Sequence, residues 1–172
     1  TFLGGFDKKY LTLPREVLIN AMREHQRYFS VVDNRGDLLP YFIAVSNTKA
    51  EDMNIVRLGN ERVLRARLED ARFYFDEDLK KKLEERVDDL RGVVYQDRLG
   101  TMYQKVERIT DLSTYIASRI DPPIEGIMKR ASYLCKADLV TGMVGEFPKL
   151  QGVMGKRYAL LTGEETEVAE AI

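Results

Sequence analysis

Apolar residues recur at helical spacing along most of this chain, and this repeat limits the fold more than any other feature. From about residue 48 onward, successive segments place apolar side chains three or four residues apart. In the segment GNERVLRARLEDARFYF, one such face carries Leu64, Leu68, Ala71 and Phe75. A stripe of this kind is typical of an amphipathic helix packed on a core. We therefore expect a predominantly α-helical chain.

The first 50 residues follow a different pattern, which mixes helix and strand. Pro14 suits a helix start. A helical apolar repeat follows it at Val17, Leu18, Ala21 and Met22. Residues 28–32 and 38–47 are rich in aromatic and β-branched side chains and flank the turn-forming segment DNRGD. We expect these two strands to form a hairpin, with Pro40 at an edge or at a strand start. The fold class is therefore α+β, with a small mixed part at the N-terminal end.

More helices are expected in the rest of the chain. Residues 79–90 place four apolar side chains on one side, namely Leu79, Leu83, Val87 and Leu90. Residues 99–120 repeat the pattern with Met102, Val106, Ile109, Ile116 and Ile120. The segment DPP at 121–123 breaks the chain, and a helix resuming near Ile124 is expected to carry Asp138. Residues 162–172 start a final helix, for which Thr162 is a candidate cap.

Asp138 is unusual because it falls on the apolar face of its expected helix. It shares that face with Ala131, Leu134 and Cys135. A buried carboxylate needs hydrogen bonds or a cation. The candidate partners are backbone N–H groups at a nearby helix start and the side chains of Lys136, Arg130, Arg157 and Thr141.

Charged residues also form a pattern on the expected helix around residues 59–75. A stripe of alternating sign, which reads as a solvated ladder of ion pairs, contains Glu61, Arg65, Glu69, Arg72 and Asp76. Arg67 lies instead within the apolar arc, so its guanidinium needs a partner. That partner is either Asp70 or a phosphate or carboxylate of a ligand.

Composition and motifs exclude several classes of protein. The 27 basic and 28 acidic residues give a net charge of −1, so any RNA contact must use local patches. No apolar run approaches the ~20 residues of a membrane span, and there is no phosphate-binding P-loop or zinc-ligand spacing. The single Cys135 is expected to be a buried thiol, and the single His25 to be structural. Because the chain lacks an initiator Met and stops inside an expected helix, we expect a fragment of a longer protein.

Several long blocks of the sequence carry a family resemblance. They occur in the order LPREVLINAMREHQRYFSV, LLPYFIAVSN, GNERVLRARLEDARFYFDEDLKKKLEERVDDL, VVYQDRLGTMYQKVERI and KADLVTGMVGEFPKLQGVMGKRYA. Together they resemble the β subunit of the bacterial tetrameric glycyl-tRNA synthetase. The resemblance runs from about residue 6 to residue 172 and covers an internal slice of that subunit.

The resemblance implies a layout and a function. Residues 1–60 would be the C-terminal part of a mixed α/β domain, 61–90 connecting helices, and 91–172 the start of a degenerate helical domain of the HD type. In this family the separate α subunit activates glycine with ATP and Mg2+, and no cofactor is expected on this fragment. The fragment would help to bind and position glycine tRNA and to hold the subunits together in the cytoplasm, without an active site of its own. Membrane and DNA partners are not expected.

The HD resemblance also implies what is missing. HD hydrolases hold a divalent metal with an adjacent His-Asp pair and further ligands, whereas the nearest match here is Ala137-Asp138. Alanine cannot ligate a metal, so we expect neither a metal nor a catalytic residue. Candidate tRNA contacts, each of which also reads as solvated surface charge, are Arg62, Arg65, Arg67, Lys156 and Arg157. The alternatives are an interface module without RNA contact and a metal-dependent phosphohydrolase of the HD type.

Overall fold

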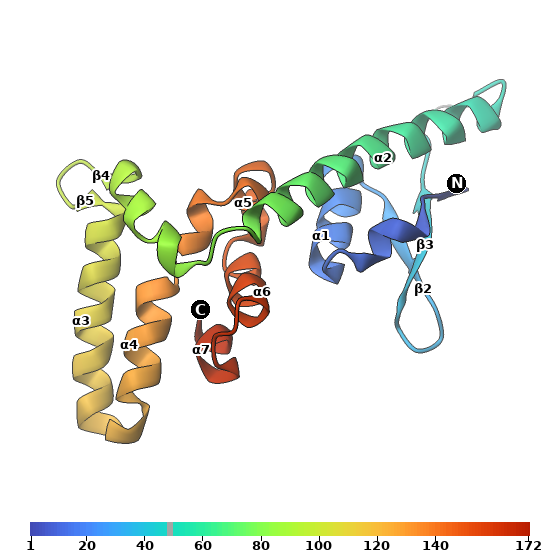
Figure 1. Ribbon diagram of the computed structural model, residues 1–172. Coiled ribbons are helices and arrows are strands. Elements are labelled where there is room, and N and C mark those ends of the chain that lie inside the picture. The colour runs from blue at the N-terminus through green and yellow to red at the C-terminus, as the bar shows by residue number, and fades with distance from the viewer. Residues whose placement is uncertain (48–49) are drawn as a thin grey trace. The chain divides into compact units, whose positions relative to one another are not determined.

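The computed structural model describes residues 1–47 and 50–172, apart from the side chain of His25. The structural role expected for His25 therefore lies outside the described residues. Helices predominate and the sheets are small, which confirms the predicted α+β, mainly helical class (Figure 1). The described residues form two compact units, 1–75 and 76–172. The predicted three-part domain division stays a prediction, although one helix, α2 (Met53–Asp78), runs across its first boundary at residue 60.

Unit 1 consists of a three-stranded antiparallel sheet and helices packed against one of its faces. Its strands lie in the order β1-β3-β2, so β3 is central. Before α2, its elements are β1 (Phe2–Gly5), a 3-10 helix (Lys8–Thr12), α1 (Arg15–Asn20), a π-helix (Ala21–His25), β2 (Phe29–Val32) and β3 (Leu38–Ala44).

Alternation along β3 separates a buried face of the sheet from an exposed one. Phe42 and Ala44 are buried, whereas Tyr41 and Ile43, which alternate with them, are exposed. The Phe42 ring stacks on the Tyr28 ring, with 4.4 Å between the ring centroids. Gly4 makes this packing possible, because a Cβ atom there would collide with the Phe42 ring. The core of unit 1 therefore depends on a glycine in the neighbouring strand.

The predicted hairpin of β2 and β3 is confirmed, but the prediction for Pro40 is wrong. Pro40 is the third residue of the central strand, and its carbonyl accepts a hydrogen bond of 3.0 Å from Phe6 N–H. Towards β2, the register shifts between Ser30 and Val32, opposite this part of β3. A bulge tolerates a residue that lacks an N–H donor, which explains a proline inside the sheet.

Helix α2 confirms the predicted apolar stripe, since Leu64, Leu68 and Ala71 are fully buried. The charged stripe beside it is more than a solvated ladder. Glu61 accepts hydrogen bonds from Gly5 N–H at 2.9 Å and from Arg57 at 3.0 Å. Glu69 accepts one of 3.1 Å from the Tyr10 hydroxyl, and burial together with this bond raises the pKa of Tyr10 to about 12. Acids of α2 thus attach the helix to β1 and to the first 3-10 helix.

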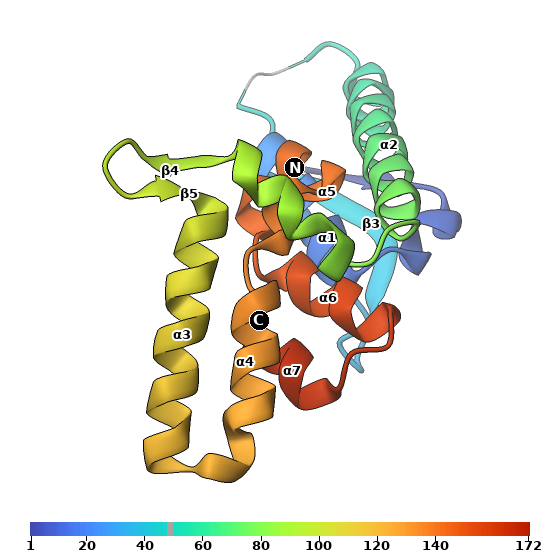
Figure 2. The same cartoon turned by 60° about the vertical axis from the view of Figure 1, so that its left-hand side comes forward.

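Unit 2 is built mainly from short helices. Its longer elements are α3 (Met102–Ile120), α4 (Glu125–Leu134), α5 (Gly142–Glu146), α6 (Val153–Leu161) and α7 (Thr166–Ala171). The hairpin β4 (Val94–Gln96) and β5 (Gly100–Thr101) precedes α3. The 3-10 helices are Glu84–Arg86, Asp88–Gly92, Pro122–Ile124, Ala137–Val140 and Pro148–Leu150. Helix α4 lies between α3 and α7, as both views show (Figures 1 and 2).

Three predictions for unit 2 are wrong in part. Residues 79–90 form 3-10 turns instead of one α-helix, although Leu83, Val87 and Leu90 are buried as predicted. Asp138 belongs to a separate 3-10 helix, because α4 ends at Leu134. Thr162 follows the end of α6, where its hydroxyl donates to the Tyr158 carbonyl, and Glu165 precedes α7. Asp78 and Asp138 make tertiary contacts, described below, that local periodicity does not include. Thr162 makes only local hydrogen bonds, to carbonyls of the last turn of α6.

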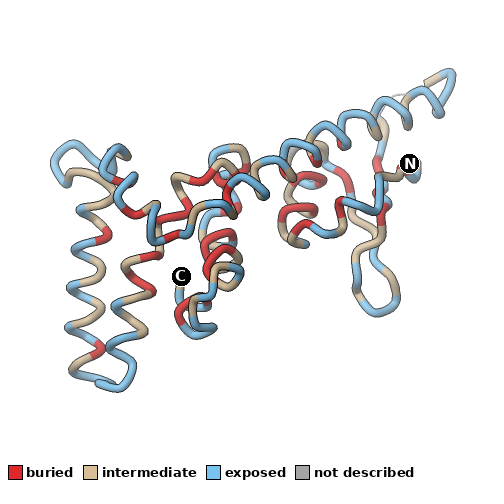
Figure 3. Tube along the Cα trace, viewed as in Figure 1, coloured by how far each residue is buried: buried red, intermediate tan, exposed pale blue. Residues whose placement is uncertain are grey.

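Helix α3 is only partly covered. Val106 and Ala117 are buried, but Ile116 is 45% exposed and Ile120 is 78% exposed, which corrects the expectation that both lie on the core face. Along most of α3 the trace is exposed or half-buried (Figure 3). The same side of the helix exposes Leu112 and Tyr115. The described residues of unit 2 therefore leave an apolar side of α3 uncovered.

Candidate functional site

Asp138 is fully buried, as predicted, and backbone N–H groups hold it. Its Oδ2 accepts hydrogen bonds from Gly152 N–H at 2.5 Å and from Gly155 N–H at 3.1 Å. Both donors belong to the start of α6, where four N–H groups have no partner within the helix. Among the candidate partners of Asp138, the prediction of N–H groups at a helix start is therefore confirmed. The Thr141 hydroxyl donates instead to the Asp138 backbone carbonyl, at 2.6 Å.

Two glycines allow this close approach. Gly152 has a φ of 80°, in the region that favours glycine. A Cβ atom on Gly155 would lie 3.3 Å from Asp138 Oδ2 and 2.7 Å from Ile172. Burial raises the pKa of the Asp138 carboxyl above its ordinary value, against the opposite effect of the two N–H donors. Its other oxygen, Oδ1, is buried without a hydrogen-bond partner among the described residues.

A second buried carboxylate, Asp78, was not predicted. It lies at the end of α2 and accepts hydrogen bonds from Gly142 N–H at 2.9 Å and Met143 N–H at 2.8 Å, at the start of α5. The Tyr158 hydroxyl donates to it at 2.9 Å, and Arg86 Nη2 lies 3.5 Å from it. Burial, and then the charge of Asp78, raise the pKa of Tyr158 well above its ordinary value. The sequence holds no signal that separates Asp78 from the neighbouring acids Asp76 and Glu77.

Arg130, another candidate partner of Asp138, forms ion pairs elsewhere. Its guanidinium donates two hydrogen bonds to Glu164, of 2.6 and 3.0 Å. It donates two more to Glu84, each of 3.0 Å. These hydrogen bonds raise the pKa of Arg130, and those to Glu164 have the larger effect. The prediction that Arg130 holds Asp138 is therefore wrong, and the side chain instead joins three separate segments of unit 2.

The residues at the HD-like position do not fit a metal. Ala137 is buried and offers no ligand, and the Asp138 oxygen that has partners faces two N–H donors, which repel a cation. Among the side chains that the structure describes, which exclude that of His25, no three His, Cys, Asp or Glu lie close enough to hold a metal ion. The arrangement suits a structural carboxylate that caps a helix.

The five cations predicted to contact RNA lie in both units. On α2, Arg62 and Arg65 are exposed and Arg67 is half-buried with partners of its own. On α6, Lys156 and Arg157 are half-buried, and Lys156 Nζ lies 3.2 Å from Glu170. The exposed pair on α2 is therefore the more accessible of the two groups. Their role in RNA binding stays a prediction.

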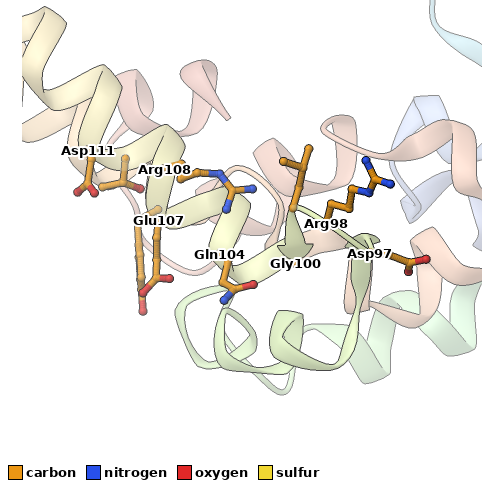
Figure 4. A pocket seen from close by; sticks show the side chains of 10 residues that line it. Asp97, Arg98, Gly100, Gln104, Glu107, Arg108 and Asp111 are labelled. Atoms are coloured by element: carbon orange, nitrogen blue, oxygen red, sulfur yellow. The ribbon is translucent and has the colours of Figure 1, made fainter.

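A cavity of about 730 Å³ lies beside the β4–β5 turn (Figure 4). Its charged side chains come from the turn and from the first turns of α3, namely Asp97, Arg98, Glu107, Arg108 and Asp111. Gln104, also in its wall, accepts a hydrogen bond of 2.9 Å from Thr101 N–H and caps α3. Three carboxylates beside two guanidinium groups give this cavity no preference for an anion.

Comparison of the sequence with known proteins identifies its family. A family model described as "Glycyl-tRNA synthetase beta subunit" matches residues 1–172. Among similar proteins, the "Glycine--tRNA ligase beta subunit" of Trichlorobacter lovleyi is 58% identical over 170 residues, which cover 99% of this chain and 25% of that protein. The proteins of the same name from Geobacter sulfurreducens and Citrifermentans bemidjiense are 58% and 59% identical over 169 residues, which cover 98% of this chain and 25% of each protein.

Two further findings complete the comparison. The chain spans about a quarter of the length of these curated relatives. Among the described residues, no helix is long and apolar enough to cross a membrane. With a family model matched from the first residue to the last, and relatives 58% identical over almost all of its length, the chain belongs to the glycyl-tRNA synthetase β subunit family.

Proposed function

We propose that the chain serves a glycine–tRNA ligase as part of its β subunit, where it binds and positions tRNA and supports subunit assembly. The observation that carries this proposal is the family match along all 172 residues. In the complete enzyme, ATP-dependent glycylation of tRNA would take place at the α subunit, with ATP and Mg2+ bound there. The setting would be the cytoplasm.

The buried polar groups favour a supporting role over a chemical one. Asp78 and Asp138 each accept hydrogen bonds from N–H groups at a helix start, and Arg130 is engaged by Glu84 and Glu164. Groups held in this way fix the packing of helices and are not poised to transfer protons. Unit 2 would therefore act as a rigid platform rather than as an active site.

Exposed cations supply the RNA contact in this proposal. Arg62 and Arg65 project from α2, whose other side is anchored in the core by Leu64 and Leu68. Arginine binds phosphate oxygens with paired hydrogen bonds, and a rigid helix fixes the position of both guanidinium groups. We assign these two residues to the phosphate backbone of tRNA, which positions the RNA without reading its sequence.

Charge-removing variants test this assignment. We expect the double variant Arg62→Gln/Arg65→Gln to weaken binding of glycine tRNA by about tenfold or more and to reduce its salt dependence. Arg35→Gln, which removes an exposed arginine from the β2–β3 turn, is the matched control. Equal affinity of the double variant and the control for tRNA would contradict the role of α2.

A second candidate, an interface module without RNA contact, is favoured by the uncovered side of α3. That side exposes Leu112, Tyr115, Ile116 and Ile120, and contiguous exposed apolar side chains mark contact surfaces. On this reading the chain would bind the α subunit or other parts of the β subunit, and its tRNA binding would be absent even at low salt.

A further inference from the structure

A second cavity, of about 480 Å³, lies in unit 1 where the chain passes from α1 into β2. It is lined by Ile19, Arg23, Arg27, Tyr28, Phe29 and Ser30. The lining residues thus include two arginines and two aromatic rings and no carboxylate. This composition contrasts with the cavity beside the β4–β5 turn, where acids outnumber arginines.

An unusual backbone path shapes this cavity. The π-helix Ala21–His25 follows α1 directly, and Arg27 then adopts a φ of 57°, the only positive φ of a non-glycine residue in the part of the chain described. Residues other than glycine rarely adopt this conformation, and both π-helical turns and such strained residues are frequent at functional sites. Arg27 N–H bonds to the Arg23 carbonyl at 3.2 Å, which keeps the two arginines together.

Tyr28 holds this path in place. Its N–H donates to the Met22 carbonyl at 3.0 Å, its ring stacks on Phe42, and its hydroxyl donates to Asn60 of α2. Tyr28 is therefore a structural anchor, and the residues on either side of it project outward. The Phe29 ring is 62% exposed, and Arg23 and Arg27 are both exposed.

The guanidinium groups of Arg23 and Arg27 are available to bind a ligand. Arg23 has only a distant ion pair with Glu24, at 3.9 Å, and the guanidinium of Arg27 has no partner among the described residues. Guanidinium groups bind phosphate oxygens, and an aromatic face stacks on nucleobases. The Ser30 hydroxyl, in the same wall, can bond a sugar or a base edge.

We propose that this cavity binds one unpaired nucleotide of tRNA, with its phosphate on Arg23 and Arg27 and its base stacked on Phe29. The nucleotide is unpaired because a base within a duplex cannot present its face to a protein ring. This inference rests on the proposed tRNA-binding function and adds the residues and the nucleotide conformation. A free mononucleotide offers the same phosphate and base, so the test includes one.

The test compares variants of the whole 172-residue chain. Fluorescence anisotropy measures their affinities for glycine tRNA, a short single-stranded oligoribonucleotide and AMP. The variants are Arg23→Gln/Arg27→Gln and Phe29→Leu, with Arg35→Gln and Tyr41→Leu as controls of the same chemistry on the β2–β3 turn and on β3. All five altered side chains are exposed, and thermal unfolding checks that each variant is folded.

We expect two distinguishable losses. The double arginine variant should weaken tRNA and oligoribonucleotide binding by about tenfold or more, with a salt slope that is shallower by roughly 0.7 to 0.9 for each phosphate that the variant no longer neutralises. Phe29→Leu should weaken binding about 5- to 100-fold without changing the salt slope, because stacking involves no ion release. The two controls should bind as the wild type does.

The other outcomes separate the two proposals. If the wild type binds tRNA and the cavity variants bind it equally well, the cavity proposal is overturned and the proposed function stands. If the wild type binds AMP through these residues but does not bind tRNA, the cavity serves free nucleotides and the RNA assignment is wrong. If neither ligand binds at low salt, both proposals are overturned.

Discussion

The Tyr158 hydroxyl donates a hydrogen bond of 2.9 Å to Asp78, a residue 80 positions earlier in the chain. Both side chains are buried, and the same carboxylate accepts the N–H groups of Gly142 and Met143. One carboxylate thus connects the end of α2, the start of α5 and the middle of α6. The contact therefore fixes the end of α2 against α5 and α6.

Removal of the Tyr158 hydroxyl tests the strength of this contact. We predict that Tyr158→Phe lowers the free energy of unfolding by about 1.5 to 3 kcal/mol, the usual range for a hydrogen bond to a charged group. Urea denaturation measures the change, and Tyr115→Phe, at an exposed position on α3, serves as the control. A loss no greater than that of the control would show that the bond contributes nothing.

Removal of the Asp78 carboxylate should be more damaging. Asp78→Ala leaves the Tyr158 hydroxyl and two N–H groups of α5 without their acceptor and leaves Arg86 without its anion. We predict a loss of about 3 to 5 kcal/mol in unfolding free energy, as for other broken buried charge pairs. Glu77→Ala, which removes an exposed ion pair with Lys80, should change stability by under about 0.5 kcal/mol in the same urea experiment.

The contribution of Asp138 to the free energy of unfolding should decrease as the pH rises. Burial raises the pKa of its carboxyl above 3.8, so it ionises more readily in the unfolded chain. Below pH 3.8 it is neutral in both states and its contribution to stability is complete. As the pH rises through the higher pKa of the folded state, the contribution is lost.

The variant Asp138→Asn should remove this loss, because asparagine keeps an acceptor for Gly152 and Gly155 and does not ionise. We predict that the unfolding free energy of the variant, minus that of the wild type, increases as the pH rises above 3.8. Urea titrations at each pH measure it, with Asp121→Asn at an exposed position as the control. A difference that stays constant or decreases with pH would contradict a raised pKa of the buried Asp138 carboxyl.

Gly155 should resist even the smallest side chain. In Gly155→Ala the new Cβ would press on Asp138 Oδ2, at 3.3 Å, and on Ile172, at 2.7 Å. Ile172 can shift, so we predict a moderate loss of about 1 kcal/mol in unfolding free energy. Gly126→Ala, in α4 with open space around it, should instead stabilise the chain by up to about 1 kcal/mol in thermal or urea unfolding. Equal effects of the two changes would show that the contact with Asp138 is not tight.

Periodicity predicted the parts of the fold that local sequence determines. The stripe of Leu64, Leu68 and Ala71 and the hairpin of β2 and β3 follow from spacing alone. The 3-10 turns after residue 78 do not, because their apolar spacing equals that of a helix. Asp138 is buried as expected, but it lies in a separate 3-10 helix and not on the helix from which its burial was inferred. Pro40 was misplaced because the irregular register between β2 and β3, where residues 39–41 lie opposite residue 31, has no signature in single-sequence patterns.

The candidate sites were less accessible to sequence reasoning. The expected helix around residues 59–75 predicts that Arg62 and Arg65 are accessible, and both are exposed on α2. Arg23 and Arg27 were not predicted as site residues, since neither the π-helix nor the positive φ of Arg27 has a distinctive sequence pattern. Asp78 was missed because the N–H and hydroxyl groups that donate hydrogen bonds to its side chain lie 64 to 80 residues away.

The most direct test of the tRNA-binding role is titration of the wild-type chain with glycine tRNA and with an unrelated tRNA over a series of salt concentrations. We predict measurable binding of glycine tRNA at low salt, with affinity that falls steeply as salt increases because several arginine–phosphate contacts release counterions. No binding of either tRNA at low salt would contradict it and would favour the interface role of α3.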